Sequence, residues 1–399
     1  MLENKYLVRT PLLDPKQQVV GYKLAWQKNE KSSELLDEEE LHQLQSLVTA
    51  HFSGSRLGLL FMEASPVALS EKALQSMSPQ TTVLILKRSD LADANSVARA
   101  VLFREQGFAL AICDADLAFL QANELLLLHT AYVLIDFGHP DLTAITNFAK
   151  FRKSPFVVVV DKIPSWHAFD ACAGLGMHGV FENLCLAPHK MGSTAQLGPQ
   201  AKQILLLMQM VQDNADIRQI EKILKSDVTL SYKLLRYINS AGFGLNTEIE
   251  SPRHAVAMLG YAPLFRWLVL LLARTNTTSF SPALMQAAMV RGRFAELLGQ
   301  GFFTKKEAEN LFTVGMFSFL DHLLGIPIEE VLGQLMLPEA VTQALLSRAG
   351  EFGRVLALAE ASEQGRGCAS DVAKALSMTS AHVNQAHLSA LAWAHDIEL

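Results

Sequence analysis

The hydrophobic pattern of this chain changes near its middle, and no other feature constrains the fold as strongly. From Tyr6 to about Cys185, short apolar runs alternate with longer amphipathic segments, the order of β/α units around a parallel sheet. Closure of such a sheet predicts a β/α barrel over residues 1–190. The predicted strands are Tyr6–Arg9, Val19–Leu24, Leu57–Met62, Val83–Leu86, Ala109–Cys113, Tyr132–Asp136 and Phe156–Val160, and the predicted helices are Glu38–His51, Leu91–Glu105, Leu117–Leu128 and Leu142–Phe151.

A segment rich in Pro, Gly, Ser and Thr separates the two halves, and residues 191–199 are the predicted linker. Beyond it, residues 200–399 have helical patterns throughout, which predicts an all-α bundle as the second domain. Local chemistry specifies several helix starts, because Ser281 precedes Pro282 and because Thr304 and Glu307 have capping-box spacing. The predicted fold is therefore a β/α barrel followed by a helical bundle.

Composition excludes several classes of protein. Half of the residues are hydrophobic and 19% are charged, which is enough apolar surface for two packed cores and argues against disorder. The net charge of −6 and the lack of a sustained basic run argue against nucleic acid as the main partner. The N-terminus has no signal-peptide pattern, and the apolar run Leu268–Ala273 is far shorter than the roughly 20 residues that span a bilayer. We expect a cytoplasmic protein without a membrane span.

The four cysteines have no paired spacing typical of a zinc site or a disulfide framework. They are Cys113, Cys172, Cys185 and Cys368. Reduced thiols are the simpler interpretation, and no pattern in the chain calls for a cofactor.

The stretch from Asp216 to Leu245 contains two amphipathic helical patterns that share one core. Asp227 stands where its carboxylate can cap the second helix, and Leu234 belongs to the apolar stripe of that helix. The pattern ends on Asn239 and Ser240. No catalytic group lies within the stretch, which indicates a module that holds partners.

The next run begins with Ser251 and Pro252 and stops at Gly260, so its helix has a start and a stop with physical causes. Together the two segments resemble the HDOD domain, an all-helical interaction or output module of bacterial signalling proteins. This family resembles the HD metal-dependent phosphohydrolases but generally lacks their metal ligands. The resemblance implies a binding domain with the motif residues Asp227, Leu234, Asn239, Ser240 and Gly260.

Four segments of the first half resemble the EAL family in order and spacing. They are VVGYKLAWQ, GFALAICDAD, AYVLID and VVVVDKIP. The family hydrolyses the bacterial second messenger cyclic di-GMP with divalent metals, so the resemblance implies a barrel whose chemistry lies at the carboxyl ends of its strands. The first and second of these segments lie closer together than is usual in the family, which leaves open a shortened barrel.

Most positions that correspond to the family's catalytic and metal-binding residues have the wrong chemistry. Lys23 replaces the glutamate that names the family, and a cation there would repel a metal ion. The degenerate positions are Lys23, Gln27, Leu84, Cys113, Leu134 and Pro164. The acids that remain are Glu63, Asp114, Asp136 and Asp161. These acids are too few for a two-metal site, and the sequence predicts a degenerate EAL barrel without catalytic residues and without a metal.

Two arrangements of these acids remain open. If the four acids converge within metal-binding distance, a divergent phosphodiesterase is indicated. If Lys23 pairs with one of them, the lysine occupies the place of the former metal ions and the site is inactive. This is the outcome that we expect. Asp114 and Asp136 also stand at strand ends, where aspartates commonly cap helices or hold loops, and we prefer that role to a ligand role.

The helical half has no HD-type metal motif, because its adjacent pair, Asp321 and His322, has the reversed order. We expect His322 to be a partly exposed helix residue. Arg291 and Arg293 could form a small anion site, but arginines on a helix face more often pair with carboxylates such as Glu296.

The order of the two domains resembles the YuxH-type class of bacterial EAL-HDOD signalling proteins. The resemblance implies a signal transduction regulator that acts through protein–protein interaction, in which the helical domain presents an apolar groove to an unidentified signalling protein. The inactive barrel would serve as scaffold or input. One alternative is a sensor that binds cyclic di-GMP without cleaving it. Loss of the family's arginine at Gln27 and of its lysine at Leu134 argues against a sensor, although Lys23 and Lys87 could partly compensate. The remaining alternative is residual phosphodiesterase activity.

Overall fold

The structure is a computed structural model that describes residues 5–27, 38–52, 58–151, 156–186, 198–239, 249–273, 275, 281–333, 335, 337–364 and 369–396. The chain divides into two compact units. The barrel unit comprises Met1–Ala187 and Ala361–Leu388, and the helical unit comprises Pro188–Glu360 and Ser389–Leu399. Residues 191–197 of the predicted linker and Cys368 lie outside the described residues.

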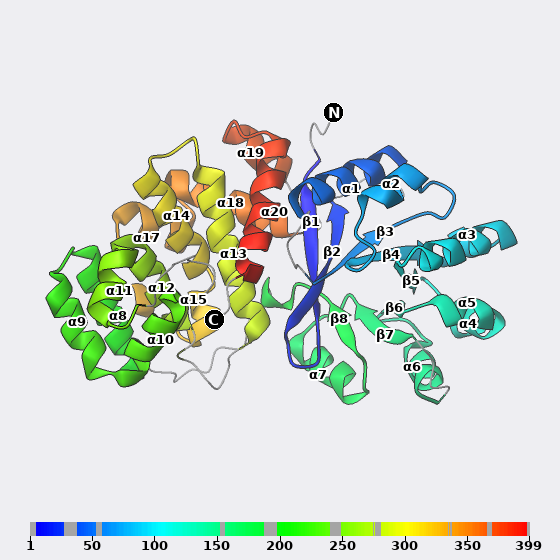
Figure 1. The fold of residues 1–399 in the computed structure, drawn as a ribbon, viewed down its shortest axis with the longest axis horizontal. Helices are drawn as coiled ribbons and strands as arrows, with labels where there is room; N and C mark the ends of the chain where they lie inside the picture. Colours follow the sequence, from blue (N-terminus) through cyan, green and yellow to red (C-terminus); the bar gives the residue numbers. More distant parts are fainter. Residues whose placement is uncertain are drawn as a thin grey trace. The chain divides into compact units, whose positions relative to one another are not determined.

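Eight strands close into a barrel in the barrel unit (Figure 1). They are β1 (Leu7–Leu13), β2 (Val19–Trp26), β3 (Leu59–Glu63), β4 (Thr82–Lys87), β5 (Ala109–Cys113), β6 (Tyr132–Asp136), β7 (Val157–Asp161) and β8 (Gly179–Phe181). Strands β2 to β8 pair in parallel, whereas β1 is antiparallel to both β2 and β8. The predicted barrel is confirmed, and its eight strands complete the closure without a missing strand.

A tight turn between β1 and β2 explains why the first strand is antiparallel and not part of a β/α unit. One carboxylate oxygen of Asp14 accepts hydrogen bonds from the backbone amides of Lys16 (2.9 Å) and Gln18 (2.8 Å). Gln17 adopts a left-handed φ of 59°. The chain therefore reverses directly instead of crossing over through a helix, and the expectation of a wholly parallel sheet was wrong for this strand.

The segments between the later strands are helical. They are α1 (Glu38–Phe52), α2 (Glu71–Ser76), η1 (Arg88–Leu91), α3 (Ala94–Glu105), α4 (Leu117–Ala122), α5 (Glu124–His129), α6 (Leu142–Phe151), α7 (Trp166–Gly174) and, after β8, η2 (Leu184–Leu186). The single helix predicted over Leu117–Leu128 is two helices, because the backbone at Asn123 leaves the helical region with φ −116° and ψ 46°. Strand β8 was not predicted, since its three residues are too few to show a period.

Below a polar rim, the barrel interior is a packed apolar core. Alternate residues of each strand face inward. The central cluster consists of Leu12, Phe61, Val83, Ile85, Ala111, Leu134, Val159 and Phe181. Two residues further toward the carboxyl end of each strand, the next inward-facing side chains are charged. They are Glu63 on β3, Lys87 on β4 and Asp161 on β7. We call this rim at the carboxyl ends of the parallel strands the barrel mouth.

The remaining helices belong wholly or mainly to the helical unit, apart from α19, which lies in the barrel unit, and α20, which is divided between the two units. They are α8 (Pro199–Gln212), α9 (Ile217–Ser226), α10 (Val228–Ile238), α11 (Pro252–Leu259), α12 (Tyr261–Ala273), α13 (Pro282–Gly299), α14 (Lys305–Phe317), α15 (Leu320–Leu324), α16 (Ile328–Leu332), α17 (Glu339–Ser347), α18 (Gly350–Glu363), α19 (Ala369–Ala375) and α20 (Ser380–Asp396). The predicted capping box of Thr304 and Glu307 is present at the start of α14. The Ser281 side chain caps α13, which begins at Pro282. The predicted helical second half is confirmed.

The first part of the HDOD-like motif fixes the start of α10. The Asp227 carboxylate accepts hydrogen bonds from the backbone amides of Thr229 (2.8 Å) and Leu230 (3.1 Å), as expected for an N-cap. Leu234 on the same helix is fully buried. The motif therefore combines a helix cap with a core anchor.

Asn239 braces the chain after α10. Its side-chain amide donates to the backbone oxygen of Ile249 (2.9 Å) and its oxygen accepts from the backbone amide of Ile249 (2.8 Å). Gly260 ends α11 with φ 74°, a conformation that favours glycine. Asn239 and Gly260 thus have structural roles, and Ser240, the remaining motif residue, lies outside the described residues.

The most apolar helix is α12, in which Leu268–Leu272 are buried within the helical unit. In the described ranges, no single helix is long and apolar enough to cross a membrane. The pair Pro252–Leu259 and Tyr261–Leu272 meets the length and composition criteria only in combination, and it is bent by 115°.

Candidate functional site

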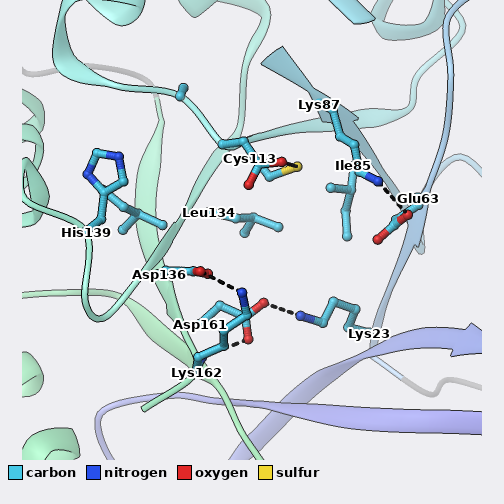
Figure 2. Close-up of a pocket in the computed structure, with 13 residues that line it drawn as sticks. Lys23, Glu63, Ile85, Lys87, Cys113, Leu134, Asp136, His139, Asp161 and Lys162 are labelled. Atoms are coloured by element: carbon cyan, nitrogen blue, oxygen red, sulfur yellow. Dashed lines mark hydrogen bonds and ion pairs between the residues drawn. The ribbon is translucent and has the colours of Figure 1, made fainter. Parts of the chain in front are cut away.

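A cavity of about 280 Å³ opens at the barrel mouth. Its lining consists of Lys23, Glu63, Ile85, Lys87, Cys113, Asp114, Ala115, Leu134, Ile135, Asp136, His139, Asp161 and Lys162. Figure 2 shows charged side chains from opposite walls of the barrel pointing toward one another across this cavity. Catalytic sites of β/α barrels occupy this end of the barrel. The four predicted acids therefore do gather at one site.

Each of three lysines at the mouth holds one carboxylate. Lys23 on β2 forms an ion pair with Asp161 at the end of β7. The pair between Lys87 and Glu63 joins neighbouring strands β4 and β3 at 3.2 Å. Lys162 reaches Asp136 on β6 at 2.6 Å. Four carboxylates and three ammonium groups leave the lining with a formal charge of −1 when His139 is neutral.

Lys23 is the most informative of these cations because it stands where the EAL family has a glutamate. Its ammonium group lies 5.0 Å from the centre of the Phe181 ring, in addition to its pair with Asp161. The Lys23 and Asp161 side chains are 23% and 19% exposed, so water screens this pair less than a surface pair. The expected pairing of Lys23 with one of the remaining acids is present.

Lys162 forms the most exposed of the three pairs, with 72% of its side chain accessible to solvent. Its hydrogen bond to Asp136 is the largest influence on its pKa and raises it, which keeps the ammonium group charged. The backbone of Lys162 has a left-handed φ of 58°, and its amide donates to an Asp161 oxygen at 2.9 Å. This turn directs the lysine side chain back over the cavity.

The Cys113 thiol does not provide a thiolate at the mouth. Burial is the main cause of its raised pKa, and the nearby charges of Asp114 and Glu63 raise it further. The sulfur lies 3.7 Å from an Asp114 oxygen. These surroundings therefore favour the protonated thiol.

The helix-capping part of the expectation for Asp114 and Asp136 was wrong, whereas Asp136 does hold a loop, because it pairs with Lys162 in the segment after β7. Asp116 is the residue that caps α4, where its carboxylate accepts the backbone amide of Phe119 at 2.8 Å. Asp114 has a left-handed φ of 58° and lines the cavity, as does Asp136. Both carboxylates thus face the mouth.

Three of the predicted degenerate positions do not line the cavity. Leu84 is fully buried on β4 between two inward-facing residues, so Ile85 is the β4 residue that lines the cavity beside Lys87. The face of a strand that is apolar on both sides cannot be read from its sequence, which explains this error. Pro164 is exposed in the segment after β7.

Gln27, the third of these positions, binds another part of the barrel unit. Its side-chain amide donates to the backbone oxygens of Ala361 (2.9 Å) and Gln364 (3.0 Å). The residue that the EAL resemblance aligns with the family's arginine therefore holds the end of α18.

The donor set at the mouth does not fit a two-metal centre. Among the residues that the structure describes, no group of three or more His, Cys, Asp or Glu side chains is arranged to hold a metal ion. Three of the four acids already hold an ammonium group. An ion between them would meet three positive charges at short range.

Sequence reasoning missed Lys162, His139 and Glu182. The first two were not singled out because each stands in a segment that the strand pattern treats as a loop. Glu182 follows β8 directly, and burial raises its pKa, with a smaller contribution from the Asp161 charge. No local pattern indicated this carboxylate, because β8 itself was not predicted.

The charged residues of the helical unit form internal pairs. Glu296 is 5% exposed and accepts hydrogen bonds from Arg266 and, at 2.7 Å, from Arg293. Arg291 donates to the Ser318 hydroxyl at 2.8 Å. The expected pairing of these arginines with carboxylates thus holds for both, because Arg293 pairs with Glu296 and Arg291 lies 3.7 Å from a Glu360 oxygen.

His322 is partly exposed, as expected. Its side chain is 21% accessible and lies 3.2 Å from the neighbouring Asp321 carboxylate. The pair belongs to the short helix α15, in agreement with the expectation of an ordinary helix residue.

Comparison with solved structures finds EAL domains. The EAL domain of Mycobacterium smegmatis DcpA aligns with 46% of this chain and 92% of that chain, at 16% identity and a TM-score of 0.37.

Two proteins are similar to this chain over most of its length. The uncharacterized protein YuxH of Bacillus subtilis strain 168 is 22% identical over 412 residues and covers 98% of both chains. The cyclic di-GMP phosphodiesterase CdgJ of Vibrio cholerae serotype O1 is 25% identical over 373 residues, which cover 90% of this chain and 85% of CdgJ. The family model of the HDOD domain matches residues 198–392. The HDOD family model therefore matches most of the helical half of this chain, and the part of the chain that precedes the match folds into an eight-stranded β/α barrel.

Proposed function

We propose that this protein is a regulator in cyclic di-GMP signalling that binds a protein partner and does not hydrolyse the nucleotide. The observation that carries the proposal is the set of three lysine–carboxylate pairs at the barrel mouth. The similarity to CdgJ supports the signalling context. The HDOD domain supports partner binding, because its motif residues serve as a helix cap, a core anchor and a backbone brace.

The pairs at the mouth oppose hydrolysis for an electrostatic reason. Two-metal hydrolysis of a phosphodiester needs several anionic oxygens free to coordinate ions that lie about 3.5–4 Å apart. Here Asp161, Glu63 and Asp136 each neutralise a lysine, so a metal would have to displace fixed cations. The Lys23 ammonium group is held by its ion pair with Asp161 and by its contact with the Phe181 ring. Displacing it would leave Asp161 without its partner, which costs free energy.

A second candidate is a sensor that binds cyclic di-GMP without cutting it. Its support is that Lys23, Lys87 and Lys162 all line one cavity, where ammonium groups can meet phosphate oxygens. A phosphate would have to compete with the carboxylate that each lysine already holds. The formal charge of −1 on the lining works against an anionic ligand, so we rank the sensor second.

Two measurements on the same samples separate the candidates. The full-length protein is titrated calorimetrically with cyclic di-GMP, with and without Mg²⁺ or Mn²⁺, and the samples are then analysed for products by chromatography. We expect no heat of binding and no linear or mononucleotide product. An active EAL phosphodiesterase in the same buffers is the positive control. Binding without product would identify the sensor, and metal-dependent product would overturn the proposed loss of hydrolysis.

A further inference from the structure

A segment from the end of the chain belongs to the barrel unit. The described residues 361–364 and 369–388, which we call the C-terminal strap, comprise the end of α18, all of α19 and the first part of α20. Figure 1 shows α19 and α20 beside β1. Asn384 and His387 of the strap are buried and form hydrogen bonds with the first residues of the barrel unit.

The strap meets the barrel at an incomplete seam between β1 and β8. These two strands pair at Leu12 and Leu13, because β8 is short, and among the described residues no strand pairs with the first half of β1 along that edge. Asn384 of the strap takes the place of a strand there. Its side-chain oxygen accepts the backbone amide of Leu7 and its amide donates to the backbone oxygen of Lys5, both at 2.8 Å. Strand edges need such partners, since unpaired backbone groups are costly when buried.

Buried charges hold the strap at the same seam. Arg9 of β1 is 5% exposed; its Nε donates to Nε2 of His387 at 2.9 Å, and its Nη2 lies 3.3 Å from a Glu363 oxygen. Burial and the Arg9 charge lower the pKa of His387, so the ring is neutral and accepts this bond. Polar, hydrogen-bonded contacts of this kind are typical of interfaces whose two sides can separate. Permanently packed interfaces are more apolar.

The residues that follow β8 connect the seam to the barrel mouth. The side-chain amide of Asn183 donates to the backbone oxygens of Arg9 and Glu363, each at 3.3 Å. The backbone amide of Asn183 donates in turn to the Glu182 carboxylate at 2.9 Å. Glu182 interacts electrostatically with Asp161 and Lys23. The geometry that joins the Lys23 pair to this segment is strand β8, because Phe181 lies 5.0 Å from the Lys23 ammonium group, is the register partner of Asp161 and directly precedes Glu182.

We propose that the C-terminal strap is a releasable seal on the seam between β1 and β8, and that its docking is coupled to the charge pair of Lys23 and Asp161 through Glu182 and Asn183. Anything that withdraws Lys23 from Asp161 leaves Glu182 exposed to the Asp161 charge without the opposing Lys23 cation, while Lys162 continues to face Asp161. Like charges at short range displace or protonate one of the two groups. Either change alters the acceptor that orients Asn183, and Asn183 holds both β1 and the strap.

Hydrogen exchange of the full-length protein, measured by mass spectrometry without nucleotide, tests the coupling. In Lys23→Met and in Asn183→Ala we expect amides 380–388 to exchange about tenfold faster, because the strap loses one or two hydrogen bonds. The matched control is Lys87→Met. Lys87 also holds a mouth carboxylate and is similarly shielded, at 20% exposure against 23% for Lys23, but its partner Glu63 lies on β3.

In Lys87→Met we expect amides 380–388 to exchange within about twofold of the native rate, as for a site without shared partners. Lys23→Arg keeps the cation and should restore the native rate. Equal acceleration in Lys23→Met and Lys87→Met would overturn the coupling, as would native exchange in Asn183→Ala. Acceleration of Ala109–Cys113 to the same extent would also overturn it, since it would mean that the whole barrel has loosened. Exchange measured without nucleotide distinguishes failure of this proposal from failure of the proposed function.

Discussion

Replacement of Lys23 by glutamate is expected to make the barrel mouth bind divalent metal ions. The change removes the ammonium group that neutralises Asp161 and adds a carboxylate at the same place, near Asp161 and Glu182. Without an ion, repulsion among these carboxylates destabilises the variant. Mn²⁺ relieves that repulsion, and at about 100 times its dissociation constant it adds about 2.7 kcal/mol to the free energy of unfolding. A shift of the thermal midpoint by roughly 5–10 °C would report this binding.

The control for this experiment is Lys23→Met, which removes the cation but adds no ligand. We expect Mn²⁺ to leave the midpoints of the native protein and of Lys23→Met nearly unchanged. Stabilisation of the native protein by Mn²⁺ as large as that of Lys23→Glu would show that Lys23 does not keep metals out. A metal response of Lys23→Glu without any cyclic di-GMP turnover is compatible with our interpretation, because Ile85 and Leu134 still line the cavity without donor atoms.

Substitution of Arg9 by alanine is expected to cost about 3–5 kcal/mol in the unfolding free energy of the barrel unit, the range for removal of one partner of a buried ion pair. Arg9 is 5% exposed and Glu363 is 3% exposed, so the remaining carboxylate would be buried without its cation. His387 would lose the donor to its Nε2 at the same time. Urea unfolding of the full-length protein, with hydrogen exchange to assign the transition to the barrel unit, measures the loss.

Two further variants sharpen the Arg9 experiment. Lys162→Ala breaks an exposed pair, with the lysine side chain 72% accessible, and should cost at most about 1 kcal/mol. Glu363→Gln keeps an oxygen that can accept from Arg9 and should cost less than Arg9→Ala. A cost below about 1 kcal/mol for Arg9→Ala would contradict the role of Arg9 as an anchor of the strap.

The sequence was sufficient to predict the barrel, the helical half and the chemistry of Lys23. Short apolar runs and helical periods extend over many residues, so strands such as Ala109–Cys113 and Tyr132–Asp136 were predicted at their observed bounds. The pairing of Lys23 followed from the charge of one side chain in a site otherwise rich in acids. Periodicity and charge are properties that a local stretch of sequence contains.

Other features depend on information that no local stretch contains. Leu84 was assigned to the mouth because TVLILK is apolar on both faces, and only the register of β4 with its neighbours shows that Ile85 and Lys87 face inward. Arg9 stands in an apolar run, where nothing nearby in sequence suggests that it is buried against a histidine. Its partner His387 lies 378 residues away in the chain. Contacts at such separation are products of the tertiary fold.

The discontinuity of the barrel unit has a consequence during synthesis. Strand β1 leaves the ribosome long before the strap, because Asn384, which completes its edge, is made 377 residues after Leu7. At about 5–20 residues per second, that interval is on the order of 20–75 s. Throughout it the edge of β1 is a template for pairing with other chains, a known route to aggregation. A nascent chain stalled before the strap would therefore be a client for chaperones, even though the eight barrel strands had already been made.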